Sequence, residues 1–215
     1  MTAPIGPKQM PLITGKYKKN RVLLQYKETI NMRNTAEITD TEHRYDTISR
    51  GMHWAMTAAF AWIYCSAGAH YLFSESAFEK FMWPTHKPVG LLLMILLLLR
   101  AGWSLLNRHA RPPSLNIGAR FGHLLLYGFM FLIPFLGLLR QYGSGRAFSA
   151  FGLTVMDGFN GEKIQWMIDL GSNFHSLLGW TMLILITGHV GAVILHCAKG
   201  HPEVLRRMAG SGGKA

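Results

Sequence analysis

Four stretches of the chain are long, apolar and almost free of charged residues: 51–73, 85–106, 121–142 and 173–197. A helix rises about 1.5 Å per residue, so roughly 20 apolar residues cross a hydrocarbon core about 30 Å thick. The hydrophobic positions do not alternate with a period of two, and a backbone in lipid must satisfy its own hydrogen bonds, so the pattern predicts helices. The first stretch is the weakest, because Ala, Thr, Ser and Gly dilute it. We predict an all-α membrane protein, a four-transmembrane-helix bundle.

The charged residues lie mainly outside these stretches. They make up 15% of the 215 residues, against 49% hydrophobic residues, and the net charge is +11. Basic residues are denser before the first stretch, between the second and third, and after the fourth than in the other two loops, which predicts both termini on the cytoplasmic side. A soluble nucleic-acid-binding protein is excluded by the four apolar stretches.

The ends of the chain differ from its apolar middle. Residues 1–42 are polar and basic without an apolar core, and they predict a disordered N-terminal extension. Residues 43–207 form the predicted bundle domain, and 208–215 a flexible tail. No Cys-x-x-Cys-His motif occurs, so nothing indicates covalently attached haem.

Seven histidines fall in the apolar stretches, and helix direction sorts five of them into two layers. His86 and His175 share the predicted outer layer, and His53, His123 and His189 share the inner one. His175 and His189 are 14 residues apart. This spacing is about 21 Å along a helix and about 40° short of four full turns, so both side chains face the bundle interior.

Intramembrane histidines are candidates for function, and imidazole suits iron, copper and zinc. Two opposed imidazoles can hold a haem inside a helical bundle. The outer layer has one pair for this role, whereas the inner layer has three candidates for two positions.

Other residues have two interpretations each. Gly90 and Gly179 follow His86 and His175 by four residues, and either admit a flat porphyrin or let helices pack closely. His196 lies two turns beyond His189 and either meets interfacial water or binds a quinone head group. Arginines near helix ends either reach lipid phosphates or pair with haem propionates: Arg50, Arg100, Arg120 and Arg140.

Several segments resemble the bacterial cytochrome b561 family: ISRGMHWAM, THKPVGLLLMILLLLR, ARFGHLLLYGFMFLIPFLGLLRQY, FSAFGLTV, NFHSLLGW and LITGHVGAV. The likeness runs in order from about Tyr45 to Arg207. It implies a multi-pass protein of the bacterial inner membrane that binds two non-covalent b haems and passes electrons to ubiquinone. The best-understood branch of the family is similar to superoxide oxidase.

The resemblance also implies roles for individual histidines. It makes His53 and His189 the ligands of the inner haem and His86 and His175 those of the outer haem, with His196 near the quinone head. His123 matches a family histidine at the start of the third stretch, which we do not take as a ligand, although it stays among the candidate cofactor-binding residues. Where a related member has a second histidine, this chain has Arg120, and its 143–170 loop is richer in glycine. These departures concern the electron donor more than the haem sites.

The leading functional hypothesis is electron transfer between a periplasmic one-electron donor, best guessed as superoxide, and ubiquinone, by an oxidoreductase or an electron carrier. Iron with two histidine ligands suits electron transfer better than oxygen activation. The outer-loop cations Lys80, Lys87, Arg146 and Lys163 could attract an anion, although three loop acids weaken this argument. One alternative is a cytochrome b subunit of a membrane dehydrogenase or hydrogenase complex. Another alternative is a transition-metal transporter. The lack of acidic residues within the spans argues against it.

Overall fold

The structure is a computed structural model that describes residues 23–28, 44–109 and 116–210. Residues 23–28 are helical, and the rest of the predicted disordered extension (1–42) lies outside the described residues, as does the predicted tail from residue 211. The main elements follow in chain order: α2 (Thr47–Leu72), α3 (Ala77–Met82), η1 (Trp83–Thr85), α4 (His86–Leu106), α5 (Ile117–Gly143), β1 (Phe148–Ala150), β2 (Leu153–Met156), α6 (Gln165–Ala198) and α7 (Glu203–Ala209).

Side-chain caps set the starts of two long helices. Asp46 accepts hydrogen bonds from the backbone N–H and the hydroxyl of Ser49, each at 2.7 Å, and so caps α2. Asn116 caps α5 by accepting from the N–H of Ala119 at 2.7 Å. Such caps satisfy N–H groups that the first turn of a helix leaves unpaired.

Three helical segments of the described chain are long and apolar enough to cross a membrane: Ala77–Leu106, Ile117–Gly143 and Gln165–Ala198. The described chain is mostly helical, with one two-stranded hairpin, so the prediction of a helical membrane protein is confirmed, whereas the count of four spans stays a prediction. α2 has 26 residues but is not among the three, in line with its diluted composition.

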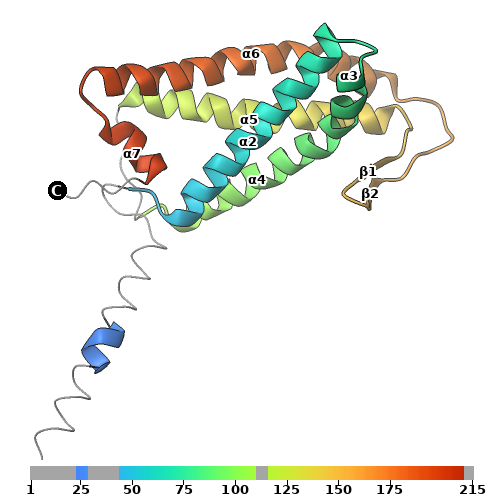
Figure 1. Cartoon of the computed structure of the whole chain (residues 1–215). Coiled ribbons are helices and arrows are strands. Elements are labelled where there is room, and N and C mark those ends of the chain that lie inside the picture. Colours follow the sequence, from blue (N-terminus) through green and yellow to red (C-terminus); the bar gives the residue numbers. More distant parts are fainter. Residues whose placement is uncertain (1–22, 29–43, 110–115, 211–215) are drawn as a thin grey trace, which may run out of the picture.

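The long helices pack as two pairs, α2 with α4 and α5 with α6, and α4 also meets α5 (Figure 1). The buried core between α2 and α4 consists of Met56, Ala59, Leu93 and Leu97. α5 and α6 approach each other closely at Gly171, where an added Cβ would lie 2.5 Å from Cβ of Arg140. Glycine is required at that crossing.

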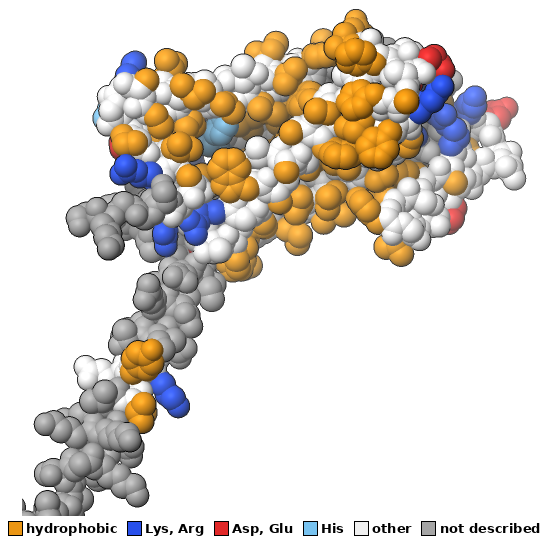
Figure 2. All heavy atoms as spheres, in the orientation of Figure 1, with side chains coloured by type: hydrophobic (Ala, Val, Ile, Leu, Met, Phe, Trp, Pro, Cys, Tyr) orange, Lys and Arg blue, Asp and Glu red, His pale blue; other side chains and the backbone are white. Residues whose placement is uncertain are grey.

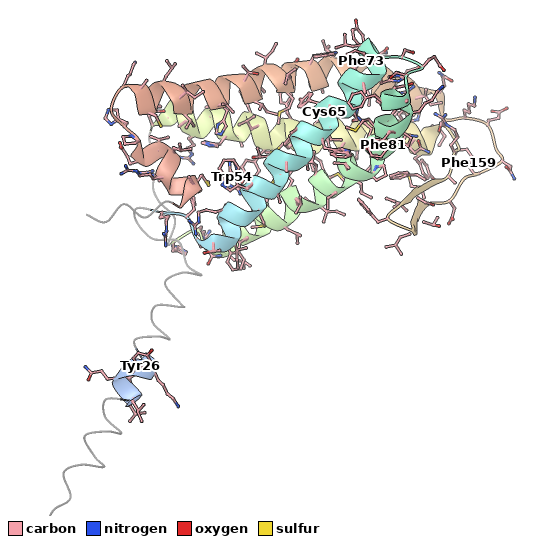
Figure 3. All side chains as sticks on the ribbon, in the orientation of Figure 1. Tyr26, Trp54, Cys65, Phe73, Phe81 and Phe159 are labelled. Carbon is pink, nitrogen blue, oxygen red and sulfur yellow. The ribbon has the colours of Figure 1, made fainter. Side chains whose placement is uncertain are left out.

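The described domain begins and ends at the same end of the bundle, here called the α7 end. The N–H of Tyr45 donates to the carbonyl of Arg207 at 3.3 Å. The indole of Trp54 donates to the carbonyl of Met208 at 3.2 Å, and Figure 3 shows Trp54 beside α7. The β1–β2 hairpin lies at the opposite end, here called the hairpin end (Figure 1).

The outer surface of the bundle suits a bilayer. Figure 2 shows hydrophobic side chains over the middle of the visible face, with Lys and Arg side chains gathered towards both ends. Large side chains such as Leu98, Leu99, Ile184 and Ile194 are more than half exposed on the helices. Without water in the bilayer core, such side chains are covered by lipid.

Candidate functional site

At the hairpin end, the structure brings together the two histidines of the predicted outer layer. His86 is the first residue of α4, and His175 lies about three turns into α6. Their ring centres are 6.2 Å apart, with the ring planes at 67°. An imidazole nitrogen binds a metal at about 2 Å and lies about 1 Å from its ring centre, so two opposed imidazoles on one metal have centres about 6 Å apart. The pair has the spacing of two axial ligands.

Hydrogen bonds fix the tautomer of both rings. Nδ1 of His175 lies 2.8 Å from the carbonyl oxygen of Ile133, which can only accept, so Nδ1 carries the proton. The hydroxyl of Ser66 donates to the carbonyl of Ile63 at 2.7 Å and therefore accepts from Nδ1 of His86 at 2.8 Å. In both rings Nε2 keeps its lone pair, which is the state a metal requires.

Glycines shape the space around this pair in two ways. At Gly137 an added Cβ would lie 3.1 Å from Cε1 and 3.2 Å from Nδ1 of His175, so the missing side chain lets the ring reach the α5 backbone. At Gly179 no atom lies within 4 Å of such a Cβ, and at Gly90 the nearest is 3.9 Å away. Close helix packing therefore does not explain Gly179, which borders open space, whereas at Gly90 an added Cβ would make an ordinary van der Waals contact with Ile63 of α2.

At the α7 end, the three predicted inner-layer histidines come together. The rings of His123 and His189 have centres 5.3 Å apart at 75°. His53, half-buried on α2, lies within electrostatic reach of both. Nδ1 of His123 lies 2.6 Å from the carbonyl of Ala119 in its own helix.

Arg100 is buried at the level of this second cluster. Its side chain is 8% exposed, and it donates to the carbonyl of Ser49 at 2.6 Å and to the hydroxyl of Tyr127 at 3.0 Å. It lies within electrostatic reach of His53. Arg100 follows His86 by 14 residues, the same spacing as His175 and His189, so α4 also presents one face at both levels.

Two further predicted residues lie near the ends of α5 and α6. Arg120 is exposed in the first turn of α5, three residues before His123. His196 is half-buried in the last turn of α6, with its ring centre 6.4 Å from that of His201.

A cationic pocket lies at the hairpin end, close to the first histidine pair. It has a volume of about 390 Å³ and is lined by Arg140, Ser144, Arg146, Lys163 and Ile168. Arg140 is within electrostatic reach of His175. Two predicted cations, Arg146 and Lys163, thus line one pocket, which also contains Arg140.

The other two predicted cations make different contacts. Lys87 donates to the side-chain carbonyl of Gln141 at 2.9 Å and lies within electrostatic reach of Arg140 and Arg146. Lys80 instead lies 3.6 Å from the carboxylate of Glu75 on the exposed surface.

Sequence reasoning did not identify Ser66 or Gly137. A signal for Ser66 existed, because Met56, Ala59, Ile63 and Ser66 follow a spacing of three and four residues along one face of α2. Such a stripe faces a neighbouring helix, and a hydroxyl in it needs a partner. No comparable signal marks Gly137.

Paired histidines in the interior of a helical membrane protein are typical of b-type cytochromes, whose haem is held without covalent bonds. Residues 44–211 match the family described as prokaryotic cytochrome b561. The chain is also 28% identical over 180 residues to cytochrome b561 homolog 2 of Escherichia coli (strain K12), covering 80% of this chain and 94% of that protein. The chain belongs to the prokaryotic cytochrome b561 family, and it is a bacterial membrane b-type cytochrome for electron transfer.

Proposed function

We propose that this cytochrome is a four-span protein with two haems that conducts electrons across the inner membrane, from a periplasmic one-electron donor to ubiquinone. The observation that carries the proposal is the pair of histidine clusters at the two ends of one bundle, joined by α6. The two levels are about 21 Å apart, from the helix rise between His175 and His189.

The position of α2 supports a fourth span. α2 starts at the α7 end and leads to α3 at the hairpin end, so it runs the length of the bundle beside the three apolar segments (Figure 1). The described domain begins and ends at the α7 end, which requires an even number of crossings. Basic residues outside the spans favour this end as the cytoplasmic side. They include Arg44, Arg50, Arg108, Arg120, Lys199, Arg206 and Arg207.

The two ligand pairs rest on different arguments. For the haem at the hairpin end, the 6.2 Å spacing of the rings and their fixed tautomers support His86 and His175. For the haem at the α7 end we assign His53 and His189, as the family resemblance implies. The 5.3 Å between the ring centres of His123 and His189 is shorter than two ligands on one metal require, which supports His53 over His123.

When bound, haem would supply a one-electron couple, and the assigned histidines are the residues that would hold it. The residues of this chain hold and tune that couple. The carbonyl of Ile133 holds His175 through Nδ1, and the apolar helices keep water away from the outer pair. Arg100 places a buried positive charge near the inner cluster, where the low polarity lets a charge act over a longer distance than at the surface.

The cationic pocket supports an anionic donor on the periplasmic side, and superoxide is the proposed one. Arg140, Arg146 and Lys163 line the pocket, and cations in a cleft raise the local concentration of an anion and its rate of encounter. Ubiquinone is proposed at the α7 end near His196, which is half-buried in the last turn of α6.

The test is a reduced-minus-oxidised spectrum of the purified protein and of two variants, His86→Ala and His189→Ala. We expect each variant to lose one haem and keep the other, whereas the matched control His109→Ala, in an exposed flank, keeps both. A colourless protein would favour the transition-metal transporter. Mixing the oxidised protein with superoxide tests the donor, and adding ubiquinone afterwards tests the acceptor. A haem that superoxide does not reduce would refute superoxide as the donor and leave the assignment as a cytochrome intact.

A further inference from the structure

Ser66 is a fully buried residue whose hydroxyl contacts one of the two outer histidines. The residue is 0% exposed, near the outer end of α2, a helix that carries neither outer histidine. Its oxygen lies 2.8 Å from Nδ1 of His86 and 2.7 Å from the carbonyl oxygen of Ile63. The hydroxyl therefore donates its one proton to the carbonyl of Ile63, and its oxygen accepts the hydrogen bond from Nδ1 of His86.

We propose that Ser66 is a positioning residue for His86: it fixes the tautomer and the rotation of that ring, and so sets the electronic properties of the outer haem. This inference rests on the proposed ligation of the outer haem by His86. A hydrogen bond accepted from Nδ1–H makes the imidazole a stronger donor to a metal, and such partners commonly orient ligating histidines.

The rotation of the ring has a measurable consequence. The planes of His86 and His175 lie at 67° to each other. Ligand planes close to perpendicular leave two iron d orbitals nearly equal in energy, which gives a low-spin ferric haem a highly anisotropic electron paramagnetic resonance signal. Since His175 is held separately by Ile133, the angle depends on what holds His86.

A contact with Trp83 does not replace this role. The Trp83 and His86 rings have centres 5.0 Å apart at 38°, so Trp83 limits the space on one side of the imidazole. It makes no hydrogen bond to the ring that would choose between tautomers. The Trp83 ring is itself stacked on the exposed ring of His70, with the ring centres 3.9 Å apart. On this side, His86 is therefore bordered by two exposed aromatic side chains.

The alternative is that the Ser66 hydroxyl only forms a hydrogen bond within its own helix and has no effect on His86. Serine in apolar helices often bonds a carbonyl one turn back, as Ser66 does with Ile63. On that alternative Ser66→Ala changes stability only, whereas a positioning role predicts a change in the haem itself.

The experiment compares Ser66→Ala with Ser66→Thr and with the matched control Ser49→Ala. Ser49 is equally buried, and its hydroxyl bonds Asp46 at the opposite end of α2. The readouts on the purified holoprotein are the midpoint potential of each haem and the resonance signal of the oxidised protein. We expect Ser66→Ala to raise the outer-haem potential and to shift or broaden the outer-haem signal, because the ferric form loses a stronger donor and the ring can rotate.

The remaining variants separate the outcomes. Ser66→Thr keeps a hydroxyl and is expected to restore the wild-type signal, and Ser49→Ala is expected to leave the outer haem unchanged. Two haems with wild-type potentials and signals in Ser66→Ala would overturn the inference while leaving the proposed ligands intact. If Ser66→Ala does not accumulate, an unaltered outer haem in Ser66→Cys, with its weak hydrogen-bonding thiol, would overturn it equally. Full retention of the outer haem in His86→Ala would instead refute the proposed function.

Discussion

Adding one methyl group at Gly137 tests the geometry of the outer site. In Gly137→Ala the new Cβ would lie 3.1 Å from Cε1 and 3.2 Å from Nδ1 of His175. Carbon atoms in contact prefer about 3.5 to 4.0 Å, so the ring has to retreat by a few tenths of an ångström. That retreat strains the 2.8 Å hydrogen bond from Nδ1 to the carbonyl of Ile133.

The size of the effect follows from the role of that bond. Losing the partner of a ligating histidine commonly lowers metal affinity about 10- to 100-fold, which equals about 1.4 to 2.7 kcal/mol. Alanine in a helix interior is favoured over glycine by about 1 kcal/mol, so α5 itself is not weakened. We expect weaker retention of the outer haem with little loss of thermal stability of the apoprotein.

The assay is the rate at which excess apoglobin removes haem from the purified protein, together with the haem content per chain. Gly128→Ala is the matched control, because Gly128 has no atom within 4 Å of an added Cβ. It is nine residues from Gly137, which places it on the opposite side of α5 at about 100° per residue. Wild-type haem loss in Gly137→Ala, or equally fast loss in Gly128→Ala, would refute the reasoning.

Three further predictions concern charge and topology. Arg100→Leu removes a buried positive charge near His53 and is expected to lower the inner-haem potential on the order of 50 mV, about 1 kcal/mol for a one-electron couple; potentiometric titration measures it. Arg146→Glu is expected to slow reduction by superoxide several-fold at low salt, with the difference shrinking at high salt, whereas Lys80→Glu, outside the pocket, has a smaller effect in the same stopped-flow assay. In a cysteine-free background, an impermeant maleimide added to intact cells is expected to label Glu75→Cys but not Lys199→Cys, and the reverse pattern would contradict cytoplasmic termini.

The features of this fold that depend on a single helix can be predicted well from the sequence. The spacing of His175 and His189 depends only on the pitch of α6, so their arrangement along one face can be worked out before any neighbour is known. The three most apolar segments depend only on length and composition, and the structure shows all three. α2 is harder to predict, because its Ala, Ser and Gly residues dilute the signal of a span. Two of them, Ala59 and Ser66, are buried against α4.

The parts that sequence reasoning missed depend on two helices at once. The importance of Gly137 becomes visible only when α6 brings His175 against the α5 backbone. The Ser66 hydroxyl matters because α4 begins with His86 at the same level as the outer end of α2. Crossing geometry between helices is set by the packing of many side chains, and a single sequence does not contain it in readable form.

The two levels of the bundle differ in how their positive charges are held, and this difference bears on the direction of electron flow. At the hairpin end Arg146 and Lys163 line an open pocket, where water and salt screen their charges. At the α7 end Arg100 is 8% exposed and fixed by Ser49 and Tyr127, so its charge acts through a medium of low polarity. A positive charge stabilises the reduced form of a nearby haem. In the proposed two-haem arrangement, the buried arginine would favour electrons at the inner haem, whereas the exposed cations would act on the arrival of an anionic donor. This difference supports the proposed direction of electron flow, from the hairpin end towards the α7 end.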